Sequence, residues 1–221
     1  MDCPQSGSQK ENGDWWREAR MTKIAIIDYG LGNLRSVIRG LEKAGAQAII
    51  TCDADEIASA DGLVLPGVGA FHEGMEQLGN LKETVLDSNR NVPLLGICLG
   101  MQMLMETSEE YGIHEGLGLI PGSVRRFPRV HGQKVPHMGW NSLTITNPDH
   151  PLFAGFGSDE YVYFVHSYYA DTTPENTLTS THYICPFASS VGTDTTFGVQ
   201  FHPEKSGAIG LRLLNNFIGM C

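Results

Sequence analysis

Cysteine is scarce in this 221-residue sequence, and its placement excludes two kinds of site. The five cysteines lie far apart, and none forms the Cys-x-x-Cys pair that zinc knuckles and many redox motifs need. An odd number without regular spacing also excludes a complete disulfide framework. Because reduced thiols are typical of the cytosol, we expect a cytoplasmic protein with free cysteines.

Long apolar runs are missing as well. No stretch of about 18 apolar residues occurs, so the sequence predicts no transmembrane helix. The first 20 residues are polar and aperiodic, and they lack the apolar segment of a secretory signal. We interpret residues 1–20 as an extension, disordered or left over from expression, and residues 21–221 as one domain.

Basic residues are outnumbered by acidic ones. Lys and Arg total 15 against 25 Asp and Glu, which gives a net charge of −10. Such a surface repels phosphate backbones and anionic lipids, so we expect no nucleic acid and no membrane among the partners. Charged residues make up only 18% and hydrophobic residues 41%, which excludes disorder for most of the chain.

The order of apolar patterns predicts an α/β fold. Up to about residue 110, short apolar runs alternate with helical periodicity, as in a parallel sheet with helices on both faces. After residue 120 the spacing is that of a strand meander, closed by a helix with Leu213, Leu214 and Phe217 on one face. We therefore expect an open, mixed, mostly parallel sheet. The predicted strands cover 24–27, 48–50, 62–65, 93–97, 124–127, 142–145, 160–165, 188–191 and 195–201, and the main predicted helices 34–44, 71–90 and 99–109.

The segment from Gly96 to Gly100 is the sharpest chemical motif. It joins a predicted buried strand to a helix and has the pattern of a nucleophile elbow, with Cys98 at its centre. The glycines let neighbouring chain pass close to a strained turn, and a helix N-terminus favours the thiolate. The alternative is that Cys98 is a small buried core residue.

A candidate base follows the last predicted strand, in the sequence His202-Pro203-Glu204. Residues two apart in an extended segment point to the same side, so Glu204 could orient the imidazole of His202. His202 would then exchange a proton with Cys98, at the carboxyl edge of the sheet where open α/β folds bind ligands. The alternative is an ordinary loop with a solvated carboxylate.

A third predicted strand leads into a glycine-rich turn over 66–69. An acyl-transfer site needs N–H donors for its oxyanion, and Gly67, Val68 and Leu99 are the candidates, Leu99 because it follows the nucleophile. A plain turn or a phosphate cradle would also fit these glycines. Neither this turn nor the one at Gly30 completes the Gly-x-Gly-x-x-Gly fingerprint, which excludes a dinucleotide cofactor. Since His131 and His137 lack further ligands, we expect no metal and no cofactor.

Segment 96–102, together with His202 to Glu204, resembles the class I, triad-type glutamine amidotransferases, whose fold is flavodoxin-like. The resemblance extends from Lys23 to the C-terminus. Five further segments are similar to one branch of that family, namely 28–34, 65–71, 136–141, 164–168 and 202–206. The resemblance implies that Cys98 attacks the side-chain amide of glutamine, releases ammonia and leaves a glutamyl thioester for water to hydrolyse. The residues it implies for glutamine binding are Gln102, Glu110 and backbone groups of Gly67, Gly69, Ser167 and Tyr168.

The residues themselves agree in part with this substrate set. Gln102 follows Cys98 by one helical turn on the same face, where it can bond to an amino-acid head group. Glu110 would stand two turns further along the same helix, where it could meet the substrate ammonium, although a solvated acidic helix end is the alternative. We interpret Met101 and Met103 as core residues, and His166 as either a packing residue or a substrate contact.

A chain of this length has no room for a second site that consumes the ammonia. Ammonia released to water becomes ammonium and is no longer a nucleophile, so the chemistry requires docking on a synthase and a dry path. The resemblance implies a heterodimer with a (β/α)8-barrel cyclase subunit in histidine biosynthesis. The positions it places at that interface are Asn33, Trp140, Asn141 and Lys205. For Trp140, capping of the core is the alternative.

Two other classes of function stay open at this point. One is a different thiol hydrolase on a similar sheet, with a peptidase-like or deglycase-like reaction and no need of a partner. The other is a non-catalytic, amidotransferase-like module, which the intact Cys98, His202 and Glu204 disfavour. Within the family, the glutaminase subunits of aminodeoxychorismate synthase and pyridoxal-phosphate synthase are the near alternatives.

Overall fold

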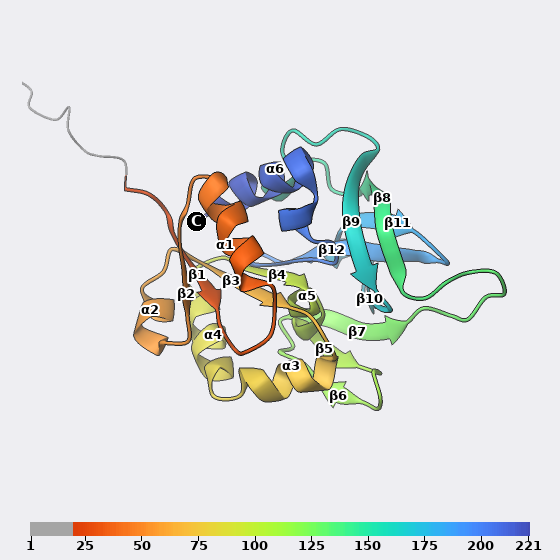
Figure 1. Cartoon of the computed structure of the whole chain (residues 1–221), viewed down its shortest axis with the longest axis horizontal. Coiled ribbons are helices and arrows are strands. Elements are labelled where there is room, and N and C mark those ends of the chain that lie inside the picture. The colour runs from red at the N-terminus through yellow and green to blue at the C-terminus, as the bar shows by residue number, and fades with distance from the viewer. Residues whose placement is uncertain (1–19) are drawn as a thin grey trace, which may run out of the picture.

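The computed structural model describes residues 20–221 and has five parallel strands at its centre (Figure 1). Their order follows the doubly wound pattern in which the chain starts in the middle of the sheet and winds to both sides. The predicted mixed, mostly parallel sheet is confirmed. In spatial order the strands are β2 (Gln47–Thr51), β1 (Lys23–Ile27), β3 (Gly62–Gly67), β4 (Leu94–Cys98) and β13 (Thr196–Val199).

Side chains that alternate along these buried strands explain why helices cover both faces. In β1, Ile24 and Ile26 pack with α1 (Leu34–Lys43) and α6 (Gly207–Ile218), whereas Ala25 and Ile27 belong to a second cluster on the opposite face. The helices that contribute to the second cluster are α2 (Ala54–Ala58), α3 (Phe71–Leu78), α4 (Leu81–Asn89) and α5 (Leu99–Met103).

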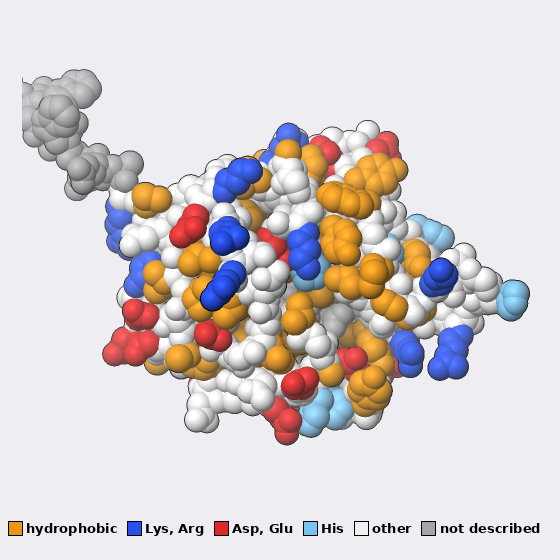
Figure 2. All heavy atoms as spheres, in the orientation of Figure 1, with side chains coloured by type: hydrophobic (Ala, Val, Ile, Leu, Met, Phe, Trp, Pro, Cys, Tyr) orange, Lys and Arg blue, Asp and Glu red, His pale blue; other side chains and the backbone are white. Residues whose placement is uncertain are grey.

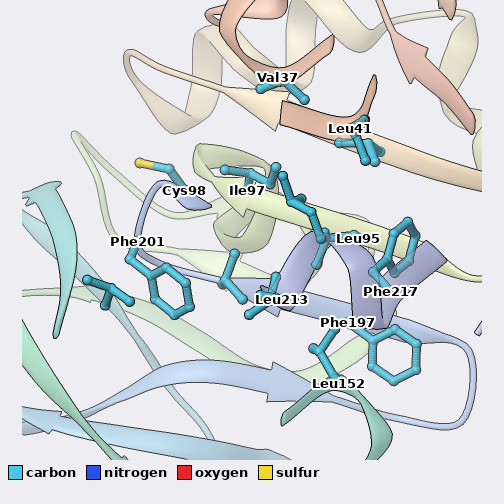
Figure 3. Packing of buried hydrophobic residues seen from close by; sticks show 14 of the residues in the cluster. Val37, Leu41, Leu95, Ile97, Cys98, Leu152, Phe197, Phe201, Leu213 and Phe217 are labelled. Atoms are coloured by element: carbon cyan, nitrogen blue, oxygen red, sulfur yellow. The ribbon is translucent and has the colours of Figure 1, made fainter. Parts of the chain in front are cut away.

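The first of these clusters reaches the nucleophile. Figure 3 shows Leu41, Leu213 and Phe217 packed around Leu95 of β4, with Cys98 at the margin of the packed side chains. Because this core is well packed, it fixes the end of β4 and therefore the position of Cys98, the last residue of that strand.

Beyond β13 the sheet becomes mainly antiparallel. Strands β12 (Pro186–Gly192), β10 (Tyr168–Asp171), β7 (Ile120–Arg126), β5 (Met105–Ser108) and β6 (His114–Glu115) continue it in that order. Off this path, β11 (Thr177–His182) pairs with β12 and with β8 (His137–Ile145), which pairs with β9 (Glu160–His166). Short 3-10 helices lie at Pro151–Phe153, Pro174–Asn176 and Pro203–Lys205.

Two helix predictions were wrong. The predicted helix 71–90 is two helices, because Gly79 between α3 and α4 takes a backbone φ of 42°, which does not continue a right-handed helix. The predicted helix 99–109 ends at Met103. Residues from Met105 onward pair with β7 instead, so tertiary strand pairing overrides the local helical periodicity.

Several smaller elements were not predicted, and some predicted strands have other ends. The strand predicted over 195–201 ends at Val199, and that predicted over 142–145 begins at His137. The elements without a sequence prediction are α2, β6, β10 and β11. The proposed extension over 1–20 lies outside the described residues except for Arg20, whose guanidinium pairs with Asp61 at 3.0 Å. In the part of the chain that the structure describes, no helix is long and apolar enough to cross a membrane.

Candidate active site

A cavity of about 390 Å³ opens at the carboxyl edge of the parallel strands. It lies where β3 and β4 end, opposite the corner between β9 and β10. Most of the residues that the sequence singled out meet here. Those that line it are Cys98, His202, Val68, Gly69, Leu99, Gln102, Glu110, Ser167 and Tyr168, joined by Pro136, Val165 and His166.

Cys98 occupies the strained turn expected of a nucleophile elbow. Its φ of 56° and ψ of −107° are rare for a residue with a side chain. The flanking glycines make room for the turn: a Cβ at Gly96 would lie 2.7 Å from the Gly100 carbonyl, and one at Gly100 would overlap the Leu65 carbonyl oxygen. The sulfur is thereby held at the N-terminus of α5, at the edge of the cavity.

This crowding gives a direct prediction for stability. Gly100→Ala should lower the free energy of unfolding by about 3 kcal/mol or more, because the new methyl group overlaps backbone atoms of β3 that cannot rotate away. Gly157→Ala is the matched control, since a Cβ there meets only the end of the Glu160 side chain at 3.8 Å. Urea denaturation of both variants measures the difference, and equal midpoints would contradict the packing argument.

His202 and Glu204 form a buried pair beside Cys98. The His202 Nδ1 lies 2.8 Å from Glu204 Oε1, and the two side chains are 3% and 1% exposed. The backbone around them is fixed, because the His202 N–H donates to Tyr163 O and its carbonyl accepts from the Ser206 hydroxyl. Within the described chain the buried His202 Nε2 has no hydrogen-bond partner, so it is the atom available for proton transfer.

The surroundings of His202 favour its protonated form. Burial lowers the pKa of the ring, but attraction to the Cys98 sulfur and to the Glu204 carboxylate outweighs burial and raises the pKa to about 9. At neutral pH the pair is therefore an imidazolium held by a carboxylate. A cation next to Cys98 stabilises the thiolate that attacks an amide carbon.

The candidate oxyanion donors are brought to the cavity with one exception. Val68 is 42% exposed, and Leu99 begins α5 directly after the nucleophile. Gly69, predicted to bind glutamine, also lines the cavity and has a φ of 106°. Gly67 is buried at the end of β3, opposite Cys98 in the parallel register, and does not line the cavity. The Tyr29 hydroxyl donates to the Pro66 carbonyl at 2.6 Å and so anchors the start of the turn over 66–69.

Gln102 is held in part by Gln200, a residue that the sequence did not predict to belong to the site. Its Nε2 donates to the Tyr168 carbonyl and to Gln200 Oε1, both at 3.0 Å, and Gln200 in turn donates to the Cys98 sulfur at 3.8 Å. With both protons of its Nε2 used, Gln102 presents its Oε1 as an acceptor for an ammonium. Gln200 is completely buried two residues before His202, and its polar character inside the apolar segment predicted as strand 195–201 was the available signal.

Glu110 reaches the cavity by a different route from the one predicted. It does not end a helix but follows β5, and its Oε2 accepts the Phe71 N–H at 2.7 Å. A carboxylate there compensates the partial positive charge at the start of α3, whose own N-cap, Ala70, has no side chain to do so. The other carboxylate oxygen of Glu110 remains for a cationic ligand.

An exposed aromatic patch lies next to the cavity on the outer face of β8 and β9. We define the β8–β9 patch as Met138, Trp140, Tyr161, Tyr163 and Lys205. Trp140 is 56% exposed and packs edge-to-face on Tyr163, over which the Lys205 ammonium lies at 5.9 Å from the ring centre. Figure 2 shows hydrophobic side chains gathered over this part of the surface.

The four predicted interface positions fall into two groups. Trp140 and Lys205 lie in the β8–β9 patch, so Trp140 does not cap the core, and Asn33 is exposed at the start of α1. Asn141 is half-buried, and its amide nitrogen donates inward to His137 Nε2 at 3.3 Å and to His182 O at 3.0 Å. The Asn141 amide nitrogen therefore bonds to groups inside the protein and does not face a docking surface.

A model of the family described as "Glutamine amidotransferase class-I" matches residues 25–220. The chain belongs to this family. It is 53% identical to the imidazole glycerol phosphate synthase subunit HisH of Methanosarcina barkeri, over 91% of this chain and all of that protein. It is 50% identical to the HisH of Archaeoglobus fulgidus, over 89% of this chain and 98% of that protein.

Two solved structures have a similar fold. A GMP synthase subunit from Thermoplasma acidophilum superposes with a TM-score of 0.70 at 26% identity, covering 91% of this chain and 94% of that one. The PurLQS structure of Thermotoga maritima gives a TM-score of 0.69 at 18% identity, with 90% and 98% covered, and supports the fold alone.

Proposed function

We propose that this chain is the glutaminase subunit of an imidazole glycerol phosphate synthase. The observation that carries the proposal is one cavity lined by a strained Cys98, by Gln102 and by His202, whose ring is bonded to the buried Glu204 carboxylate. Relatives that match over nine-tenths of the chain carry the HisH name, which favours this synthase over those of other family members.

The geometry supports a two-step hydrolysis of the glutamine side-chain amide. The Cys98 thiolate forms a bond to the amide carbon, and backbone N–H groups at Val68 and Leu99 stabilise the oxyanion. As the C–N bond breaks, His202 donates its Nε2 proton to the leaving ammonia. The neutral ring then takes a proton from water as water attacks the thioester, and the Cys98 thiolate leaves, which yields glutamate.

The remaining lining residues fit the amino-acid end of the substrate. Gln102 Oε1 and the free oxygen of Glu110 are acceptors for the α-ammonium, while backbone groups at Gly69, Ser167 and Tyr168 complete the pocket. A different thiol hydrolase would not need an ammonium site at this end, so glutamine is the substrate that accounts for these acceptors.

The partner we propose is a (β/α)8-barrel cyclase subunit in a heterodimer. It would combine the ammonia with a phosphoribulosyl-formimino carboxamide nucleotide to give imidazole glycerol phosphate and aminoimidazole carboxamide ribotide in histidine biosynthesis. The β8–β9 patch borders the cavity through Val165 and Pro136, so a partner seated on the patch would also cover the site. Such a cover keeps released ammonia away from water.

A titration with the cyclase tests this proposal. We expect the isolated chain to hydrolyse glutamine weakly and the activity to rise strongly when the cyclase carries its nucleotide ligand. Trp140→Ala should require about 30-fold more cyclase for half-maximal activation, because an exposed tryptophan in an aromatic patch is typical of an interface hot spot. Ile113→Ala, an exposed apolar residue outside the patch, should behave like the wild type.

Two outcomes of the titration would contradict the proposal. Full glutamine turnover by the isolated chain would exclude dependence on a partner. An unchanged cyclase requirement in Trp140→Ala would exclude the β8–β9 patch as the docking surface.

A further inference from the structure

A line of hydrogen bonds crosses the interior from the outer strand β8 to the glutamine pocket. The Asn141 amide nitrogen lies 3.3 Å from His137 Nε2. His137 Nδ1 lies 3.0 Å from His166 Nε2, and His166 Nδ1 lies 2.8 Å from the Tyr168 carbonyl oxygen. Both histidines are at most 5% exposed, and neither takes part in the reaction described above.

The two ends of this line fix where the protons are. The Asn141 amide nitrogen can only donate, so His137 Nε2 accepts, and a neutral ring must then carry its proton on Nδ1. The Tyr168 carbonyl can only accept, so His166 carries its proton on Nδ1 and accepts at Nε2. Both ends require the same arrangement, in which each ring donates through Nδ1 and every bond runs from Asn141 towards Tyr168.

The surroundings keep both rings neutral. Burial lowers the pKa of His137 to about 4 and that of His166 to about 3, although the bond to Tyr168 O acts in the opposite direction on His166. A second proton on His166 would place two N–H groups in the 3.0 Å gap between the rings, and a second proton on His137 would face the Asn141 N–H across 3.3 Å. Stacking on Tyr183 and Phe164, with ring centres 4.1 and 4.8 Å away, holds the His137 ring in place.

The line continues to the nucleophile through the Tyr168 carbonyl. The same oxygen accepts from Gln102 Nε2, which also donates to Gln200 Oε1, and Gln200 donates to the Cys98 sulfur. The carbonyl is therefore shared between the histidine pair and the side chain that presents an acceptor to the substrate. Its position decides where Gln102 lies.

We propose that His137 and His166 are positioning residues, a hydrogen-bonded pair of fixed proton order that holds the Tyr168 carbonyl for glutamine binding and ties it to Asn141 on strand β8. This role rests on the proposed glutaminase function. The positioning role explains why two polar histidine side chains are buried in an otherwise apolar core, where burial of a polar group is unfavourable. It also gives Asn141, next to Trp140 of the β8–β9 patch, a direct connection to the substrate pocket.

Kinetics of the full chain with the cyclase test the positioning role. His137→Phe keeps a stacked ring but removes both hydrogen bonds and leaves His166 Nε2 unpaired, so KM for glutamine should rise about tenfold with kcat unchanged within about twofold. His137→Asn can return an N–H at the place of Nδ1 and should recover most of the loss. Tyr183→Phe is the matched control, because it keeps the stacking partner and removes only the bond from its hydroxyl to Lys134 O.

Nitrogen-15 spectra of the imidazole rings in the wild-type chain test the proton order without any variant. We expect both rings to be protonated at Nδ1 and unprotonated at Nε2 between pH 6 and 8, with the His137 signals assigned by their loss in His137→Asn. An Nε2-protonated ring would overturn the proposal even if glutamine is hydrolysed normally. A wild-type KM in a folded His137→Phe would overturn it as well. Absence of glutaminase activity in the wild type would instead contradict the proposed function, and the spectra would still decide the proton order.

Discussion

Replacing Cys98 by alanine is expected to lower glutamine-dependent synthesis by at least about 10⁴-fold while leaving ammonia-dependent synthesis by the pair intact. The first step needs a sulfur at the amide carbon, and no other thiol lines the cavity in the described residues. Added ammonia bypasses this step, because it reaches the cyclase without passing through the thioester. The measurement is product formation by the reconstituted pair with either nitrogen donor.

The design of this experiment separates chemistry from folding. Cys185→Ala removes a half-buried thiol outside the cavity and should keep both activities, which controls for the loss of a sulfur as such. Alanine also relieves none of the elbow strain, since φ stays at about 56° for any side chain at position 98. If Cys98→Ala lost both activities while remaining folded and bound, the proposed role of the sulfur would be wrong.

The parts of the fold that local patterns dictate were predicted from the sequence. The buried strands around the nucleophile have apolar residues on both faces, and the glycines of the elbow are required by close backbone contacts within β3 and α5. The Cys98 turn and the His202–Glu204 spacing are local features of the chain. The structure places Cys98 and His202 in one cavity and bonds Glu204 to the His202 ring, as the spacing had suggested, although their roles stay a proposal.

What could not be predicted depends on contacts between distant segments. Glu110 was expected on a helix, but pairing between β5 and β7 ends that helix early and brings the carboxylate to the start of α3. Gln200 carries no motif that distinguishes a network residue from a strand residue. The His137–His166 contact joins positions 29 apart, and their pairing follows only from the register of β8 with β9.

Replacing Glu204 by glutamine is expected to lower kcat of the cyclase-activated glutaminase about 10³-fold. Glu204 Oε1 accepts the proton on His202 Nδ1, which keeps Nε2 available to transfer protons. A glutamine amide can turn its NH2 towards Nδ1 and so favour the tautomer with a proton on Nε2, which cannot take one from water. Glu115→Gln, at an exposed position on β6, is the control and should leave kcat unchanged.

The same substitution should also change how stability depends on pH, which distinguishes electrostatics from a simple loss of packing. The pKa of His202 is raised from 6.5 to about 9 in the folded state, so its contribution to stability is complete below pH 6.5 and is lost as pH rises through about 9. Without the Glu204 charge the folded pKa falls, and the free energy of unfolding should decline less over that interval. Urea denaturation at pH 6 and pH 9.5 measures the slope, and an unchanged slope in Glu204→Gln would mean that the carboxylate does not hold the imidazolium. A flatter slope together with the reduced kcat would show that both effects come from the His202–Glu204 interaction. The Glu204 charge that stabilises the protonated ring is also the charge that prepares the ring to protonate the leaving ammonia.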